Sequence, residues 1–314
     1  MILETFRRLK MAGLLGMNRR NADYIMRCNP RSLFPLVDDK ILTKKLAESY
    51  QIPAPPLYAV IDQHGGVAGL LESLGGNRQF AVKPARGSGG SGIILIGDVT
   101  EKGYVTQSGQ LISPQDLSYH ISDILSGVYS LSGLEDKALI EALIHPDSTF
   151  ETVTFQGVPD IRVISYRGVP VMSMVRLPTR ASDGKANLHR GAIGAGVDLS
   201  KGVTMTAVSR SQVISQHPDT GKPVSGIQIP YWEKILWMGA RSFEMTGLGY
   251  IGVDLVIDRD RGPLLLELNA RPGLAIQLAN RRGLKERLDR IDRAPAEIFA
   301  SAEARVEWAK GAFR

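Results

Sequence analysis

The sequence predicts an α+β protein. Two observations support this class: apolar residues recur at helical spacing within residues 1–50, and strand-like apolar runs dominate from residue 138 onward. With 314 residues, 43% of them hydrophobic, the chain can form one large domain or two ordinary ones. No segment approaches the roughly 20 apolar residues that a membrane span requires, so we expect a cytoplasmic protein without stable membrane insertion.

The first half of the chain is predicted to alternate helices with short strands. Asp38 and Asp39 should open a helix, because acidic side chains stabilise helix N-termini, and the prolines after Ile52 should end it. Strands are then expected at 57–61, 80–83 and 93–96, with a short helix near 67–74. The more polar residues 98–137, with a hairpin and a helix at 113–129, are interpreted as an insertion between core elements.

The second half is predicted to be mainly β. Strands are expected at 138–143, 160–166, 169–177, 252–257 and 263–268, with a helix at 230–246 and a basic helical tail. The stretch 178–230 is rich in Gly, Ser, Thr and Asn and is predicted to form long loops around a site.

The net charge and the cysteine content exclude some classes of function. The net charge of +6 favours an anionic ligand, yet the basic residues are spread along the chain and only 6% of residues are aromatic. We therefore expect phosphate handling rather than nucleic-acid binding. The single cysteine, Cys28, excludes an internal disulfide and any cysteine-rich zinc site.

A lysine at a strand end marks the first candidate site. Lys83 precedes a loop of small residues, namely Gly87, Ser88, Gly89, Gly90, Ser91 and Gly92. Glycines let backbone N–H groups approach phosphate oxygens, and the lysine supplies a point charge. The pattern is neither a Walker A motif nor a Rossmann fingerprint, and a loop without function is the alternative interpretation.

Three oxygen-bearing side chains near the C-terminus form the second candidate site. Asp254 lies in one predicted strand, while Glu267 and Asn269 share one face of the next, because residues i and i+2 of a strand point the same way. Such hard oxygen ligands suit Mg²⁺. An ordinary polar strand end is the alternative, but charges beside apolar runs such as 264–266 need a partner or a metal.

The third candidate site is a basic cluster. Arg176, Lys185, Asn187, His189 and Arg190 fall within fifteen residues. Arginine binds phosphate and carboxylate groups in a bidentate manner, so the cluster suits a transferring phosphoryl group or an acid substrate. His189 taken alone is better interpreted as a hydrogen-bonding scaffold residue than as a general base. The order of Ser, His, Asp and Cys residues favours neither a hydrolase nor a zinc enzyme.

These motifs, taken in chain order, resemble the ATP-grasp superfamily. The resemblance rests on Lys40, Lys83 with its loop, Glu141, Asp254 and the Glu267-x-Asn269 motif. Segments 160–162 and 187–191 are similar to RimK-type ligases. Segments 17–21, 157–162, 176–180 and 268–274 are similar to the related alpha-L-glutamate ligase-like proteins, and the likeness covers about residues 15–290.

The resemblance implies an ATP-grasp fold, with two α+β lobes sandwiching the nucleotide and a shortened helical N-terminal region. The implied domains are a helical N-terminal region (1–50), a small lobe with the glycine-rich loop and the insertion (51–140, insertion 98–137), a large lobe with the metal site (141–290) and a C-terminal helical tail (291–314).

The resemblance also implies roles for individual residues. Lys40 and Lys83 would contact ATP phosphates, and Glu141 with the backbone of Ala142 and Leu143 would read adenine. Asp254, Glu267 and Asn269 would hold one or two Mg²⁺ ions, for which Mn²⁺ would substitute. The implied catalytic residues are Arg176, Lys185, Asn187, Arg190 and Arg271, and the implied substrate contacts are Asp160, Arg162, His189 and Arg271.

The implied activity is an ADP-producing ligase that forms a carbon–nitrogen bond. It would activate a carboxylic acid as an acyl phosphate and add glutamate or another amino acid to a peptide, a protein or a small acid. Two alternatives stay open. One is an ATP-grasp phosphotransferase or sugar-transfer-associated ligase, and the other is a non-catalytic nucleotide-binding regulatory module. A homo-oligomer is compatible with the sequence.

Overall fold

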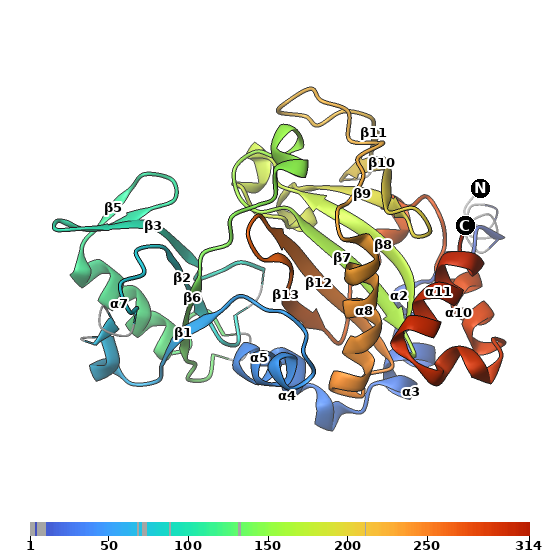
Figure 1. Ribbon diagram of the computed structural model, residues 1–314, viewed down its shortest axis with the longest axis horizontal. Helices are drawn as coiled ribbons and strands as arrows, with labels where there is room; N and C mark the ends of the chain where they lie inside the picture. The colour runs from blue at the N-terminus through green and yellow to red at the C-terminus, as the bar shows by residue number, and fades with distance from the viewer. Residues whose placement is uncertain are drawn as a thin grey trace. The chain divides into compact units, whose positions relative to one another are not determined.

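The computed structural model describes residues 4, 11–67, 69–70, 74–87, 89–130, 133–210 and 212–314. The chain forms two compact units, shown in Figure 1. Unit 1 comprises Met1–Val37, Lys45–Pro53 and His145–Arg314, and unit 2 comprises Asp38–Lys44 and Ala54–Ile144. Each unit combines a sheet with helices, so the predicted α+β class is confirmed.

Unit 2 is built on a six-stranded antiparallel sheet with the strand order β1-β6-β2-β3-β4-β5. Its strands are β1 (Leu57–Ile61), β2 (Phe80–Pro84), β3 (Ile94–Thr100), β4 (Gly103–Thr106), β5 (Leu111–Ile112) and β6 (Ala138–Ala142). Strands β2 and β6 are buried along their whole length. The central strand β2 pairs with β3 on one side and β6 on the other, which places the end of β2 beside β6.

Helix α7 (Pro114–Leu125) covers this sheet. Ser113 caps its N-terminus in a reciprocal capping box with Asp116, an arrangement that typically stabilises a helix by about 1 kcal/mol. Leu117, Ile121 and Ile124 recur at helical spacing and are buried in the same core cluster as β2 and β6. Residues 98–137, expected to be an insertion between core elements, therefore supply part of the core of unit 2 itself.

Unit 1 is built on a seven-stranded antiparallel sheet with the order β11-β10-β9-β8-β7-β12-β13. Its strands are β7 (Asp160–Tyr166), β8 (Val169–Leu177), β9 (Ile193–Asp198), β10 (Val203–Ser209), β11 (Gln212–Ile214), β12 (Tyr250–Asp258) and β13 (Gly262–Asn269). Strands β7 and β12 are buried along their whole length, and this includes charged residues such as Asp160, Arg162 and Asp254.

Helix α8 (Trp232–Thr246) packs on one face of this sheet (Figure 1). Gly239 allows the close approach, since a Cβ atom there would lie 3.0 Å from Val163, and its carbonyl accepts a hydrogen bond of 2.8 Å from Ser165 Oγ. Further α-helices among the described residues are α2 (Met17–Arg19), α3 (Met26–Cys28), α4 (Pro35–Asp38), α5 (Lys40–Ser49), α9 (Ile276–Ala279), α10 (Lys285–Asp292) and α11 (Ala302–Ala312), and a π-helical segment spans Arg20–Ile25.

The structure corrects some sequence predictions and confirms others. The stretch 178–230 is not only loops, because it supplies β9, β10 and β11 to the sheet. The helix expected at 113–129 ends at Leu125, since Gly127 adopts a φ of +80°. The helix expected near 67–74 lies largely outside the described residues. Asp39 does open α5, because its Oδ1 accepts the N–H of Ile41 at 2.9 Å.

Candidate functional site

In unit 2, two lysines meet one buried carboxylate. We call Lys44, Lys83 and Glu141 the lysine cluster. Lys83, at the end of β2, donates to Glu141 Oε1, and Lys44 Nζ lies 2.7 Å from Glu141 Oε2. Lys44 also donates to the Pro55 carbonyl at 2.7 Å. The cluster exists because α5 places Lys44 over β6, next to β2.

Burial and an excess of positive over negative charge determine the electrostatics of the lysine cluster. Glu141 is 2% exposed. Burial alone would raise its pKa, but the charges of Lys83 and Lys44 hold the pKa of Glu141 below its usual value. Burial lowers the pKa of Lys44, against the attraction of Glu141. Two ammonium groups facing one carboxylate leave a net positive charge, which suits an anion.

The glycine-rich loop follows directly from β2. Lys40 Nζ donates to the Gly87 carbonyl at 2.6 Å, and the Gly92 carbonyl lies 2.9 Å from His120 Nε2. Gly92 has a φ of +74°, and a Cβ atom there would lie 2.6 Å from the Tyr129 ring. The structure thus brings Lys40 to the predicted loop, while Ser88 lies outside the described residues.

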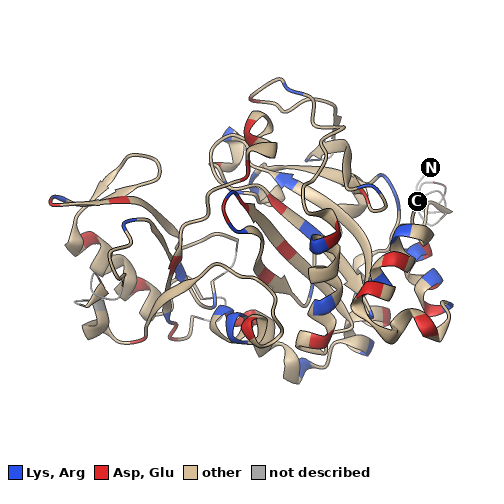
Figure 2. Ribbon diagram, in the orientation of Figure 1, with Lys and Arg blue, Asp and Glu red and all other residues tan. Residues whose placement is uncertain are grey.

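In unit 1, a row of charged side chains crosses the sheet. We call Asp160, Arg162, Arg176, Asp254, Glu267 and Asn269 the carboxylate row. Strand register aligns them, because Asp160 pairs with Arg176, and Asp254 pairs with both Arg162 and Glu267. Figure 2 shows such charged residues on neighbouring strands of this sheet. The row unites predicted catalytic, substrate and metal residues in one place.

Asp254 is the centre of the carboxylate row. It is fully buried, and its Oδ1 accepts from Arg162 Nε at 2.6 Å. Its Oδ2 accepts from Arg162 Nη2, from Arg176 Nη2 at 2.8 Å and from Asn269 Nδ2 at 3.1 Å. Arg176 also makes a bidentate pair with Asp160. A carboxylate with this many donors is held rigidly in one orientation.

The pKa values within the row diverge. Burial, reinforced by the charge of Asp254 and opposed by Arg176, raises the pKa of Asp160 to about 7. Burial also acts to raise the pKa of Asp254, but Arg162 and Arg176 outweigh it and hold this pKa well below its usual range. When all are ionised, three carboxylates face two guanidinium groups, so the row carries a net negative charge.

The row is compatible with a magnesium ion at its Glu267 end. Glu267 and Asn269 are only partly buried, and Asn269 Nδ2 also donates to Glu267 Oε1 at 3.3 Å. A carboxylate and an amide oxygen at a partly open edge fit Mg²⁺, which is usually bound through one or two carboxylates together with substrate phosphates. Within the described residues, no group of three or more His, Cys, Asp and Glu side chains is arranged around a metal position.

Other predicted residues lie in the loop after β8. Lys185 Nζ lies 3.6 Å from Asp183, and the Asn187 side chain accepts the N–H of His189 at 2.9 Å. These contacts of Lys185 and Asn187 stay within the loop and do not join them to the carboxylate row. His189 and Arg190 are exposed on a 3₁₀ helix, Leu188–Arg190.

Two further predicted features are already engaged in the structure. Arg271 is exposed, and its guanidinium lies 5.2 Å from the centre of the Phe34 ring. The Ala142 N–H, expected to read adenine together with Leu143, donates to the Pro56 carbonyl at 2.8 Å.

Sequence reasoning missed three residues that support these clusters. Lys44 could have been found from its spacing, because it lies four residues after Lys40 on α5 and so shares its helix face. Asp136, whose carboxylate accepts the Arg86 N–H at 2.9 Å, carries no such signal. Nor does the buried Asn29, whose side chain bonds the backbone at Tyr250 and Ala270 and so fixes the ends of β12 and β13.

The structure is that of an α+β protein with the lysine cluster in one unit and the carboxylate row in the other. The sequence profile of the family described as "Sugar-transfer associated ATP-grasp" matches residues 19–293. This chain belongs to the sugar-transfer associated ATP-grasp family. The predicted ATP-grasp superfamily and fold are thereby confirmed. The family description names a class that the sequence had left open as an alternative.

Solved structures of several ATP-grasp proteins are similar to this chain. D-cycloserine synthetase DcsG is 17% identical, over 92% of this chain and 80% of that chain, with a TM-score of 0.45. A RimK domain ATP-grasp protein from Sphaerobacter thermophilus is 13% identical, over 81% and 69%, with a TM-score of 0.44. The ATP-grasp ligase PsnB, complexed with minimal precursor, is 13% identical with a TM-score of 0.44, and the match covers 84% of this chain but only 62% of PsnB. No curated protein matches the sequence.

Proposed function

We propose that this protein is an Mg²⁺- and ATP-dependent ligase that activates a carboxylic acid as an acyl phosphate and joins it to an amine. One observation carries the proposal: a single ATP-grasp chain holds one cluster of two lysines around a carboxylate and another of three carboxylates around two arginines. The positive lysine cluster suits ATP phosphates, and the negative carboxylate row suits a divalent cation.

In this proposal, the lysine cluster binds the nucleotide. Lys83 and Lys40 contact phosphate oxygens, and Glu141 fixes the position of Lys83. Because Glu141 is also paired with Lys44, it does not neutralise the cluster. The glycine-rich loop supplies backbone N–H groups to the phosphates.

The carboxylate row would hold the metal and the transferring group. Glu267 and Asn269 would be the ligands of Mg²⁺, which neutralises phosphate charge when bound. Arg176 and Arg162 are preorganised by Asp160 and Asp254, so they can stabilise charge on the phosphoryl group without further ordering.

The reaction has two steps. A carboxylate oxygen of the acid attacks the γ-phosphorus of ATP, and ADP leaves. The amine nitrogen then attacks the acyl carbon, phosphate leaves, and the nitrogen loses a proton to give the amide. Fixed cations next to the transferred group favour the first step, because its charge is spread over the phosphoryl oxygens.

The finer assignments belong to the same proposal. They include glutamate or another amino acid as a substrate, a peptide, protein or small acid as its partner, and roles for Lys185, Asn187, His189, Arg190 and Arg271. A second metal ion, use of Mn²⁺, a homo-oligomer and a cytoplasmic location also stay predictions. Within the described residues, no helix is both long and apolar enough to cross a membrane.

A second candidate is favoured by the family description, which refers to sugar transfer. In this alternative, the same nucleotide site would serve a phosphotransferase or a ligase whose acceptor is a sugar hydroxyl or a sugar-linked group. The two candidates differ in the group that attacks, so they can be separated by trapping the intermediate.

The test is ADP release from Mg²⁺-ATP across a panel of carboxylic acids, with hydroxylamine as a surrogate amine. Acid-dependent ADP with a matching hydroxamate is the expected result. ADP release that depends on a sugar, without hydroxamate, would favour the second candidate. Binding of ATP with no turnover on any acid or sugar would favour a non-catalytic nucleotide-binding module or a macromolecular acceptor.

The metal assignment has its own test. Glu267→Gln should abolish Mg²⁺-dependent ADP formation and weaken Mg²⁺ binding measured by calorimetry, because it removes the charge proposed to hold the ion. The matched control is Glu297→Gln, which changes an exposed carboxylate elsewhere in unit 1. Equal Mg²⁺ affinity in the two variants would remove Glu267 from the metal site.

A further inference from the structure

Unit 1 contains a pocket that the proposed ligase chemistry does not use. It has a volume of about 300 Å³. Three segments line it: Ala12 and Leu14 near the N-terminus, residues around the β10–β11 turn, and residues 277–283 after β13. None of the lining residues belongs to the carboxylate row.

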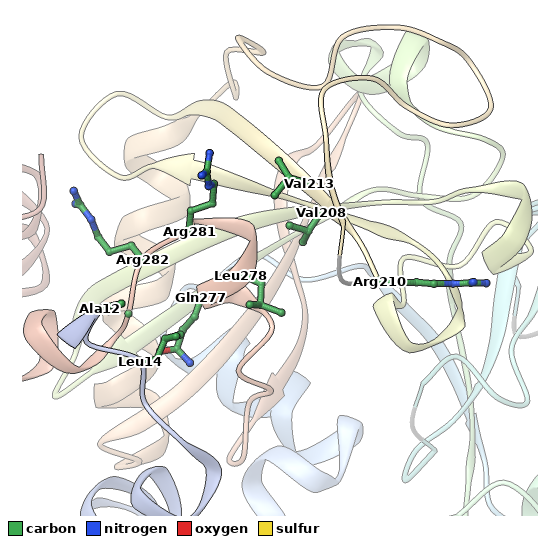
Figure 3. A pocket seen from close by; sticks show the side chains of 10 residues that line it. Ala12, Leu14, Val208, Arg210, Val213, Gln277, Leu278, Arg281 and Arg282 are labelled. Atoms are coloured by element: carbon green, nitrogen blue, oxygen red, sulfur yellow. The ribbon is translucent and has the colours of Figure 1, made fainter. Parts of the chain in front are cut away.

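Apolar side chains line the middle of the pocket. Figure 3 shows Val208, Val213 and Leu278 next to one another in its middle. Gln277 also lines it, but the Gln277 side chain is 4% exposed and bonds both backbone groups of Leu15, at 2.8 and 3.1 Å. The polar atoms of Gln277 are therefore already hydrogen-bonded within the protein, and they hold the N-terminal segment in place instead of making the pocket polar.

Two of these apolar side chains are also exposed to solvent. Val213 is 54% exposed and Leu278 is 50% exposed. Exposed apolar side chains that lie next to one another commonly mark a binding surface.

Three arginines surround these apolar side chains. Arg210, Arg281 and Arg282 are exposed, and no ion pair formed among the described residues involves them. In Figure 3, Arg281 and Arg282 extend on one side of the apolar residues, and Arg210 extends on the other. One small acidic ligand cannot satisfy guanidinium groups that point apart, whereas a layer of separate anionic head groups can.

We propose that this face docks on the surface of an anionic membrane. Leu278 and Val213 would enter the head-group region, and the three guanidinium groups would contact lipid phosphates. The combination of apolar insertion and basic charge is the physical basis of peripheral membrane binding. The net charge of +6 on the whole chain acts in the same direction.

The test is co-sedimentation with vesicles of phosphatidylcholine, with and without phosphatidylglycerol. The full chain should bind only the vesicles that contain phosphatidylglycerol, and less tightly as salt is raised. The triple variant Arg210→Glu, Arg281→Glu, Arg282→Glu should bind at least about a hundredfold more weakly, since each basic residue near such a surface contributes roughly fivefold.

A matched control distinguishes the contribution of this face to vesicle binding from the contribution of the overall net charge. The triple variant Arg31→Glu, Arg259→Glu, Arg293→Glu changes net charge equally at exposed arginines outside the pocket, and it should keep most of the binding. Leu278→Gln tests the apolar contribution at an exposed side chain, where folding is not at risk, and should bind several-fold more weakly. Thermal melting confirms that each variant is folded.

Several results would overturn the proposal. They are failure of the wild-type chain to bind anionic vesicles, an equal loss of binding in the two triple variants, and an unchanged affinity of Leu278→Gln. Binding of decyl phosphate in solution without binding to vesicles would also reject a membrane surface and indicate a small amphiphilic ligand.

Discussion

The sequence predicts the same metal-binding role for Asp254 and Glu267, but their places in the carboxylate row predict different effects when each is substituted. Asp254→Asn would remove the buried charge that faces Arg162 and Arg176. Breaking one partner of a buried ion pair typically costs about 3–5 kcal/mol, because the remaining charge is left uncompensated. At roughly 2–4 °C per kcal/mol for a unit of this size, the melting temperature should fall by about 6–20 °C.

Glu267→Gln should behave differently. Glu267 is partly buried and accepts one hydrogen bond of 3.3 Å from Asn269, which the amide oxygen of Gln can also accept. We expect a loss of stability of about 1 kcal/mol or less, since neither a cavity nor an unpaired buried cation results. The functional loss, in contrast, should be complete if this residue holds the metal.

Thermal and urea unfolding of both variants would measure the difference, with Asp260→Asn as a control for the same chemical change at an exposed turn. The reasoning is refuted if Asp254→Asn melts within about 2 °C of the wild type. It is also refuted if Glu267→Gln is the less stable of the two, since the buried arginines would then depend on another anion.

Three further predictions follow from single positions. Glu141→Gln should lower the free energy of unfolding at neutral pH. The difference from the wild type should shrink as pH falls below about 4.5, because the lowered pKa of Glu141 contributes stability only while the carboxylate is ionised. Urea unfolding from pH 3 to 7 measures this difference. Gly92→Ala should weaken ATP binding in calorimetry with little effect on unit 1, since its Cβ would lie 2.6 Å from the Tyr129 ring. Gly157→Ala should destabilise the fold by about 1–3 kcal/mol in thermal unfolding, because its Cβ would lie 1.8 Å from the Gly184 oxygen and its φ is +68°.

The fold was predictable where local pattern and tertiary environment agree. Strands β8 and β12 are mostly buried apolar runs, and the sequence shows those runs directly. Strand β9 was missed because Gly194 and Gly196 weaken its strand signal. A Cβ atom at Gly196 would lie 2.4 Å from the Ala279 carbonyl, so the glycine is required by the close approach of α9, a contact that no local pattern reveals.

The acidic residues of the candidate site could be predicted from the sequence, but the residues that pair with them could not. Apolar flanks marked Asp254 as a buried charge, which implied some counter-ion. That the counter-ions are Arg162 and Arg176 depends on the pairing of β7 with β8 and β12, between residues far apart in the chain. Strand register is set by packing and turn geometry over the whole sheet, and it cannot be obtained from the spacing of the motifs.

This pairing limits how Asp254 can take part in metal binding. Its Oδ2 already accepts hydrogen bonds from Arg162, Arg176 and Asn269, so Mg²⁺ could reach that oxygen only if a donor leaves. Glu267 requires no such exchange, because among the described residues a single hydrogen bond, from Asn269, is directed at its Oε1. Metal affinity should therefore depend directly on Glu267, whereas Asp254 acts first through the two arginines that it orients.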